Sequence, residues 1–594
     1  MKLIVFFLIV GTNISDNGRA SLDSFVPMST NILLEDTTKN ADKSCYRPCK
    51  FNVKPRRCHF DFKIEPTIQE DGRPAITVNG MTPGPPIHVC VNDVVIVVVS
   101  NKVPGQDLGI HWHGIEQKGT PFMDGVPMVT QCPISYGSSY KYSFRASSPG
   151  TFFYHADSVN HQSDGVYGAL IVNQPQPLEP HSTMYDYDRS QENTLVVAAK
   201  FPELLTGNLE DYSQLKPSSL LINGIEDDFK LFVLPGYAYR LRLINAIAVS
   251  CPVVVSIDQH EMAIISTDGK PVKPFSTSSV QLYPGERMDV VVRASEKTGG
   301  YWVRVHGNDA CANLSAHAML VYSGFNYTAM LHNGIEDAIP KGDTDTITYG
   351  QTLESSQEAP IIIPARSVVL SIDRNILQFK DTDNDFRYIS DAIPKKPFFP
   401  ASLSLKDKGV VQINKKSFLY PNVPLLTRPT DIRKEIKCIV GKEVKNQEPQ
   451  CMLVLDANRG EILELVLLNE GFGSNDSFTF HLHGYSMQVV ASWQRGNDEP
   501  ISKEEFLKLD TEGSVKRNLQ TPPLKDTIVV PNKGFTIVRI KVDRGGSWML
   551  ECRSCGLASL PTALIINVPE TLPKSLLNSI PKCGNYKPPD VLLN

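Results

Sequence analysis

The chain has 594 residues and a net charge of −5; 41% of its residues are hydrophobic and 21% are charged. This length suggests three or four domains, and the composition is that of an ordinary globular protein. The slightly acidic balance excludes the strongly basic surface that binding to nucleic acid or to an acidic membrane would require.

The N-terminus carries the pattern of a secretory signal. Lys2 precedes an apolar run over residues 3–10, and small or polar residues follow up to Ala20. This order predicts a signal peptide over residues 1–20 rather than a buried strand. Residues 21–44 are polar and are expected to be a loose segment. No later apolar stretch approaches the roughly 20 residues of a membrane helix, so we expect no membrane span.

Two further features favour export to the extracellular space. The chain has 12 cysteines, an even number that suits an oxidising compartment. Asn-x-Ser/Thr sequons lie at Asn313, Asn326 and Asn475, where we expect glycosylation. The sequence therefore predicts a secreted glycoprotein.

A threefold internal repeat indicates the fold class. Residues 137–155, 285–304 and 534–550 each contain a glycine turn, an alternating segment, a second turn with glycine and an aromatic-rich segment. We interpret each copy as a β-hairpin, and the copies as marks of three similar β-domains. Most other segments are short β-branched runs separated by turn residues. The predicted class is all-β, with sandwich or barrel domains in series.

Polar and proline-rich stretches set the expected boundaries. The prediction is a first domain over 45–175, a second over 189–335, a linker over 336–360, and a third domain over 361–594 with a surface insertion at about 374–416.

Two His-x-His pairs are the strongest chemical signal. They are His111-Trp112-His113 and His481-Leu482-His483, and a third is half lost at His155-Ala156-Asp157. Histidines two residues apart on a strand point to the same face, and imidazole suits copper. Two such pairs from distant segments can therefore converge on one metal cluster.

These pairs, with residues 119–127, 130–134 and 525–531, make the chain resemble the multicopper oxidases, and within them the insect-type laccases. It is most similar to the insect multicopper oxidase-related proteins that lack most copper ligands. The resemblance implies three cupredoxin-like domains of Greek-key topology. It also implies a type 1 copper in the third domain and a trinuclear cluster between the first and third.

The ligand positions that the resemblance assigns to the trinuclear cluster are only partly kept. The type 2 copper would use His111 and His481. One type 3 copper would use His113, His155 and the position of Arg553; the other would use the positions of Asp157, His483 and Glu551. Asp124 keeps one of the two acidic positions beside the cluster, and Cys555 occupies the other.

The type 1 positions are almost entirely replaced. They correspond to Phe478, Cys552, Leu557 and Thr562, of which only Cys552 can be a ligand. A type 1 centre needs a thiolate and two imidazoles, so oxygen reduction of the laccase type is not expected.

Three interpretations of the altered cluster remain open. Arg553 could bridge Asp157 and Glu551 and so replace the lost copper charge. A residual site could hold one copper or zinc at His111 and His481, or zinc, iron or manganese at Asp157, His483 and Glu551. The surviving histidines could also be packed, hydrogen-bonded remnants.

The resemblance also bears on the cysteines. It implies a bridge from Cys132 to Cys583. Cys251 with Cys311, and Cys438 with Cys451, are expected pairs within domains, and Cys45, Cys49, Cys58 and Cys90 could pair among themselves. Cys552 and Cys555 are left, as a disulfide or as a redox-active pair; the βαβ context of redox-active pairs is absent.

The expected function is that of a secreted laccase-like homologue without oxidase activity, binding an unidentified protein or extracellular-matrix partner or serving a structural role. The alternatives are a residual metal-dependent oxidoreductase acting on diphenols or metal ions, and a metal-binding protein without turnover.

Overall fold

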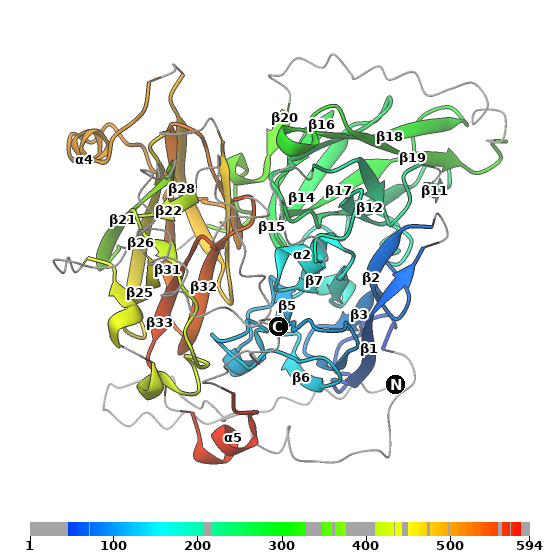
Figure 1. Ribbon diagram of the computed structural model, residues 1–594. Helices are drawn as coiled ribbons and strands as arrows, with labels where there is room; N and C mark the ends of the chain where they lie inside the picture. Colours follow the sequence, from blue (N-terminus) through cyan, green and yellow to red (C-terminus); the bar gives the residue numbers. More distant parts are fainter. Residues whose placement is uncertain are drawn as a thin grey trace, which may run out of the picture. The chain divides into compact units, whose positions relative to one another are not determined.

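The strands in the described part of the chain form three pairs of sheets (Figure 1). The computed structural model describes residues 45–69, 72–206, 216–227, 229–326, 347–358, 363–375, 410–432, 434–441, 450–471, 476–496, 499–555, 561–570 and 572–583. The predicted signal peptide, the 21–44 segment, Asn475 and Leu557 lie outside these residues.

The first pair of sheets has four strands in each layer. One layer has the order β2 (Pro74–Val78), β1 (Arg57–Ile68), β4 (Val94–Asn101), β6 (Ser139–Arg145). The other has the order β3 (Ile87–Cys90), β8 (Tyr167–Asn173), β7 (Gly150–Ala156), β5 (Ile110–His113).

The second pair has six strands in each layer. One layer has the order β10 (Ser219–Ile222), β9 (Thr194–Lys200), β12 (Ala238–Asn245), β17 (Arg287–Arg293), β14 (Met262–Thr267), β15 (Lys270–Thr277). The other has the order β11 (Phe229–Val233), β19 (Ser315–Tyr322), β18 (Gly300–Gly307), β13 (Val253–Ile257), β16 (Ser279–Leu282), β20 (Ile347–Tyr349).

The third pair contains the C-terminal strands. One layer has the order β22 (Val410–Ile413), β21 (Arg366–Asn375), β26 (Ile462–Asn469), β31 (Gly534–Lys541), β28 (Met487–Gln494), β29 (Leu524–Lys525). The other has the order β23 (Ser417–Phe418), β25 (Gln450–Asp456), β33 (Ala563–Val568), β32 (Gly546–Cys552), β27 (Phe478–Leu482), β30 (Thr527–Val530), with β24 (Lys437–Ile439) paired to β25.

The helical elements that the structure describes are short. They are α2 (Val159–Ser163), α4 (Lys503–Thr511), α5 (Lys574–Ser579) and the 3-10 turns η1 (Pro121–Met123), η2 (Gln176–Leu178), η3 (Asp309–Cys311), η6 (Gly350–Thr352), η7 (Pro429–Asp431) and η8 (Lys434–Ile436). In α4, Ser502 caps the N-terminus by accepting a hydrogen bond from the Glu505 amide. None of the helices in the described residues is long and apolar enough to cross a membrane.

The all-β prediction is confirmed, with three cupredoxin-like domains, but the hairpin interpretation of the repeat is wrong. In each copy the first strand (β6, β17 or β31) lies in one layer and the second (β7, β18 or β32) lies in the other. The turn between them therefore crosses the sandwich. The physical reason is that the two strands of a copy pair with different strands of their own layers, as β6 does with β4 and β7 with β8, which is how Greek-key sandwiches close.

Two predicted irregular segments contain paired strands. Within 336–360, β20 pairs in parallel with β16 of the second domain. At the end of the expected insertion, about 374–416, β22 pairs with β21. Residues 376–409 of that insertion lie outside the described residues.

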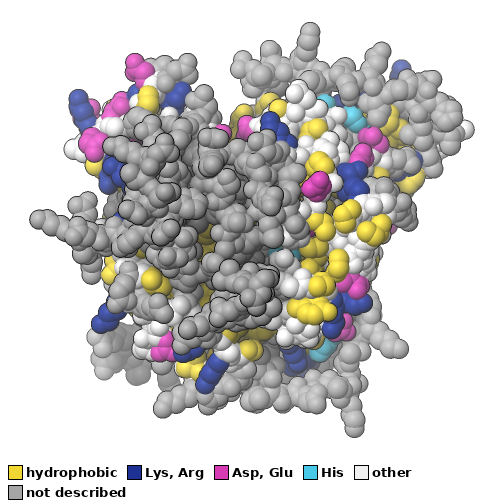
Figure 2. All heavy atoms as spheres, viewed as in Figure 1, with side chains coloured by type: hydrophobic (Ala, Val, Ile, Leu, Met, Phe, Trp, Pro, Cys, Tyr) yellow, Lys and Arg dark blue, Asp and Glu magenta, His cyan; other side chains and the backbone are white. Residues whose placement is uncertain are grey.

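Six disulfides use all twelve cysteines. They are Cys45–Cys58, Cys49–Cys90, Cys132–Cys583, Cys251–Cys311, Cys438–Cys451 and Cys552–Cys555. The four N-terminal cysteines thus pair among themselves. On the face shown in Figure 2, acidic and basic side chains are interspersed with hydrophobic ones.

A buried carboxylate joins the first domain to the second. Asp164, at the end of α2, accepts hydrogen bonds from the amides of Leu205 (2.7 Å) and Thr206 (2.9 Å) and from the Thr206 hydroxyl (2.6 Å). Burial raises the pKa of Asp164 to about 6, and these hydrogen bonds only partly oppose the shift. No cation is among these partners.

This pKa predicts a pH dependence of stability. An unfolded aspartate titrates near 3.9, so between about pH 4 and pH 6 the native state binds more protons than the unfolded state. Stability should therefore fall as the pH rises through this window, by on the order of 2–3 kcal/mol from this group. Denaturant unfolding at pH 4.5 and pH 7 should show this component in the wild type and in Asp61→Asn, an exposed control. If Asp164→Asn kept the same difference between the two pH values, the assignment would be wrong.

Candidate metal centre

The histidine-bearing strands of the first and third domains face one another. His111 and His113 lie on β5, and β5 pairs with β7 so that His111 is opposite His155. In the third domain, β27 pairs with β32 so that His481 is opposite Glu551. All four histidine side chains are buried. The two sets meet at the Nε2 atoms of His111 and His481, which are 3.2 Å apart.

Acceptor oxygens fix the tautomer of each of these imidazoles. The Nδ1 atom of His111 lies 2.8 Å from the Asp124 carbonyl, and that of His155 lies 2.8 Å from the Ala156 carbonyl. The Nδ1 atom of His481 lies 3.1 Å from the Asp526 carbonyl. Since a carbonyl can only accept, we assign the proton to Nδ1 in all three rings. Their Nε2 atoms then carry lone pairs.

His113 has the opposite tautomer. Its Nε2 atom is 3.0 Å from the Thr527 hydroxyl, which itself donates to the Asp526 carboxylate at 2.9 Å. The hydroxyl therefore accepts from His113, and the Nδ1 atom of His113 carries the lone pair. This Nδ1 atom is 3.2 Å from the Nε2 atom of His155.

Two pairs of imidazole nitrogens, each nitrogen with a lone pair, thus face each other in a buried site. Burial lowers the pKa of His111 to about 3 and also lowers the pKa values of His113, His155 and His481, so these rings are neutral at neutral pH. Two nitrogens that share one tetrahedral metal at about 2.0–2.1 Å lie roughly 3.3 Å apart. The donors of each pair fit a single metal ion, and His111, His113 and His481 are close enough to act together.

His483 is held differently from the other four. Its Nδ1 atom is 2.8 Å from an Asp124 carboxylate oxygen, and its Nε2 atom is 3.3 Å from Glu551. Burial would lower the pKa of His483, but these two carboxylates raise it to about 10. His483 is therefore protonated at neutral pH, and it would have to lose this proton before it could bind a metal together with His111 and Asp124, which lie close enough to do so.

Arg553 occupies the remaining part of the cluster site. Its side chain is 2% exposed, its Nη1 atom lies 2.9 Å from Glu551, and its other terminal nitrogen donates to the Gln162 side-chain oxygen. Although burial opposes the ionised form, Arg553 and then His483 hold the pKa of Glu551 well below its usual range. Half of the bridge predicted from the sequence is thus present. The contact of Arg553 with Asp157, which is buried at the end of β7, stays a prediction.

The residues at the type 1 positions do not fit a copper. The Cys552 sulfur is bonded to Cys555, so it supplies no thiolate. Phe478 is buried and apolar, and the Thr562 hydroxyl donates to the Val411 carbonyl at 2.9 Å. No imidazole is among these three positions, whereas a type 1 site requires two.

Sequence reasoning missed four residues that organise this site. Thr527 and Asp526 set the tautomers of His113 and His481, and Gln162 binds Arg553. Arg287 of the second domain binds Asp526 through two contacts, of 2.7 and 2.5 Å. Asp526 and Thr527 lie in residues 525–531, one of the segments that carried the family resemblance, but the resemblance assigned them no role in the site. Nothing local in the sequence marks Gln162 or Arg287.

Comparisons with known proteins agree with this architecture. Three family models described as multicopper oxidase match residues 63–177, 183–325 and 419–555. Laccase-2 of Botryotinia fuckeliana is 27% identical over 83% of this chain and 78% of its own. L-ascorbate oxidase of Cucurbita pepo var. melopepo is 27% identical over 80% of this chain and 87% of its own.

Among solved structures, the fold is similar to that of Fet3p, a multicopper oxidase that functions in iron import. The TM-score is 0.68 at 22% identity, over 86% of this chain and 90% of that one. Because three models of one family match in order along the chain, and each match lies within a different sheet pair, the chain belongs to the multicopper oxidase family.

Proposed function

We propose that this protein is a secreted, laccase-like member of its family that does not reduce oxygen and acts through binding or as a structural component. The observation that carries the proposal is the Cys552–Cys555 disulfide. In a multicopper oxidase electrons enter through a thiolate-bound copper, and here the only cysteine at that position is in a disulfide. Arg553, beside it, has no lone pair for a metal.

Export to the extracellular space is part of this proposal. The six disulfides support it, because such bonds persist in oxidising compartments. The sequons at Asn313 and Asn326 lie on exposed residues, which suits glycosylation. The binding partner would be a protein or a component of the extracellular matrix.

Oxygen consumption tests the loss of activity. Protein reconstituted with copper should show no oxygen uptake above the buffer rate with a diphenol or with ferrous iron, and no absorption band of a thiolate-bound copper. Turnover that disappears in His111→Ala would contradict the proposal and favour a residual metal-dependent oxidoreductase instead.

A second candidate function, metal binding without turnover, is favoured by the facing lone pairs of His111 and His481. Without an ion, each of these buried nitrogens lacks a donor in the assigned tautomers, which is unfavourable. Dialysis against copper or zinc followed by elemental analysis should then give about one ion per chain. The ion should be lost in His111→Ala/His481→Ala and kept in His59→Ala, an exposed control. Wild-type metal content in the double variant would exclude this site.

A further inference from the structure

A cavity of about 960 Å³ lies between the first and second domains, away from the histidine cluster. Its walls are the N-terminal segment 46–51, the proline-rich segment 172–180, and residues 185–190 with Arg240 and Arg242 of β12. We call this the interdomain cavity. Its volume is at the upper end of the range found for small-molecule sites. Neither the metal centre nor the proposed loss of activity gives it a role.

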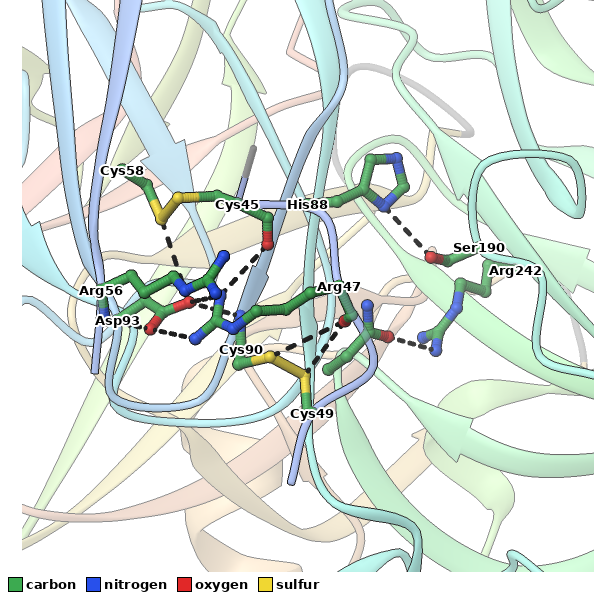
Figure 3. Close-up of a disulfide and its surroundings, with 11 residues drawn as sticks. Cys45, Arg47, Cys49, Arg56, Cys58, His88, Cys90, Asp93, Ser190 and Arg242 are labelled. Carbon is green, nitrogen blue, oxygen red and sulfur yellow. Dashed lines mark hydrogen bonds and ion pairs between the residues drawn. A yellow bond between two sulfur atoms is a disulfide. The ribbon is translucent and has the colours of Figure 1, made fainter. Parts of the chain in front are cut away.

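Segment 46–51, which forms the N-terminal wall of the cavity, is firmly attached to the rest of the first domain (Figure 3). Disulfides join the two cysteines of segment 45–51 to Cys58 and Cys90. Between them, Arg47 makes a bidentate pair with the buried Asp93, at 2.7 and 2.8 Å. A wall held by two covalent bonds and an ion pair loses little freedom when a ligand binds, which favours affinity.

The floor of the cavity carries paired charges. Arg240 lies 2.5 Å from Asp289 and 3.3 Å from Glu179, and Arg242 lies 2.6 Å from Asp188. These guanidinium groups are therefore neutralised and oriented by the protein itself. Each carboxylate has about four acceptor sites, so Glu179 and Asp188 keep some for a ligand. Their side chains are 13% and 21% exposed.

The charge balance argues against an anionic ligand. Arg47 and Arg240 are held by Asp93 and Asp289, which are buried behind the cavity wall. The lining groups that remain are Lys50 and Arg242 against Glu179, Asp186 and Asp188, a slight excess of negative charge. A sulfated or phosphorylated ligand would meet this excess without a free guanidinium to bind it.

Exposed apolar side chains are part of the cavity lining. Tyr46 is 46% exposed, Phe51 50% and Leu178 53%. Proline rings at 48, 149, 175, 177, 180 and 271 also line it. Exposed aromatic side chains beside oriented polar groups are typical of binding sites.

We propose that the interdomain cavity binds a neutral carbohydrate, as an oligosaccharide of more than one ring. A sugar ring has C–H faces that pack on Tyr46 and Phe51, and hydroxyls that donate to Glu179 and Asp188. A neutral sugar carries no charge, so it is neither repelled by the carboxylates of the cavity nor in need of a free guanidinium group. This inference rests on the proposed binding role and gives that role a ligand class.

Calorimetric titration of the full-length protein tests the proposal. The probes are neutral oligosaccharides of glucose, mannose, galactose and N-acetylglucosamine, with a heparin hexasaccharide as the anionic probe. At least one neutral probe should bind, and Tyr46→Ala/Phe51→Ala should weaken it about tenfold or more, the loss expected when aromatic contacts are removed. Tyr136→Ala removes an exposed tyrosine that does not line the cavity and should bind as the wild type does. Thermal unfolding should be unchanged in both.

Three results would overturn the proposal. They are no binding by any neutral probe, neutral binding that is unaffected by the double variant, and tighter binding of heparin than of every neutral probe. None of these results would change the outcome of the oxygen-consumption test. Conversely, turnover of a diphenol would contradict the proposed loss of activity but would say nothing about saccharide binding.

Discussion

Replacing Arg553 with alanine should lower the free energy of unfolding by about 3–5 kcal/mol, the range measured when one partner of a buried ion pair is removed. Arg553 is almost fully buried, and its guanidinium group pairs with the Glu551 carboxylate. Its removal leaves Glu551 with His483 as its charged partner among the described residues and leaves the Gln162 oxygen without this donor. Equilibrium denaturation by guanidinium chloride measures the loss.

Two further variants separate this effect from a general sensitivity to charge. Arg189→Ala breaks an exposed pair with Glu192, at 3.2 Å, and should cost under about 1 kcal/mol. Adding Glu551→Gln to Arg553→Ala should recover part of the loss, because the poorly paired carboxylate is gone. A denaturation midpoint for Arg553→Ala equal to that of the wild type would exclude Arg553 as a replacement for the copper charge.

Replacing Arg287 with alanine should have an effect of the same size, about 3–5 kcal/mol. This fully buried residue of the second domain binds Asp526 of the third domain and donates from Nε to the Thr151 carbonyl of the first at 3.2 Å. One side chain therefore joins all three domains. Its loss leaves Asp526 without its guanidinium partner, directly beneath His113 and His481.

The same strand offers a matched control for this experiment. Arg293 at the end of β17 is exposed, and Arg293→Ala should change the stability by no more than about 0.5 kcal/mol. Thermal unfolding by calorimetry should show a lower midpoint only for Arg287→Ala. A similar small shift in both variants would mean that the Arg287–Asp526 pair does not hold the domains together.

The fold class followed from local patterns, but the layer of each strand did not. Short β-branched runs, glycine turns and the threefold repeat predicted an all-β chain of three domains. The hairpin error at 137–155 arose because a turn that crosses between layers and a turn that joins neighbours have the same local sequence. The difference lies in which distant strand each segment pairs with: β6 pairs with β4, and β7 pairs with β8.

The candidate site was predictable to the extent that its geometry is local. Spacing by two on a strand places His111 and His113 on one face, and the family resemblance brings His481 to them. The roles of Gln162 and Arg287 depend on contacts across 391 and 239 residues of sequence, which no motif records. The protonated state of His483 likewise depends on two carboxylates from different domains, Asp124 and Glu551.

The Cys132–Cys583 bond has a mechanical consequence. It closes a loop with a sequence separation of 451 residues, more than two thirds of the chain. At about 3.5 Å per extended residue, roughly 1,600 Å of contour length cannot be drawn out by tension between the chain ends. A pulling force applied to the chain ends passes through the Cys132–Cys583 bond and does not act on the second domain, which lies inside the closed loop. The residues of the loop can therefore be extended only after a reductant has broken this disulfide.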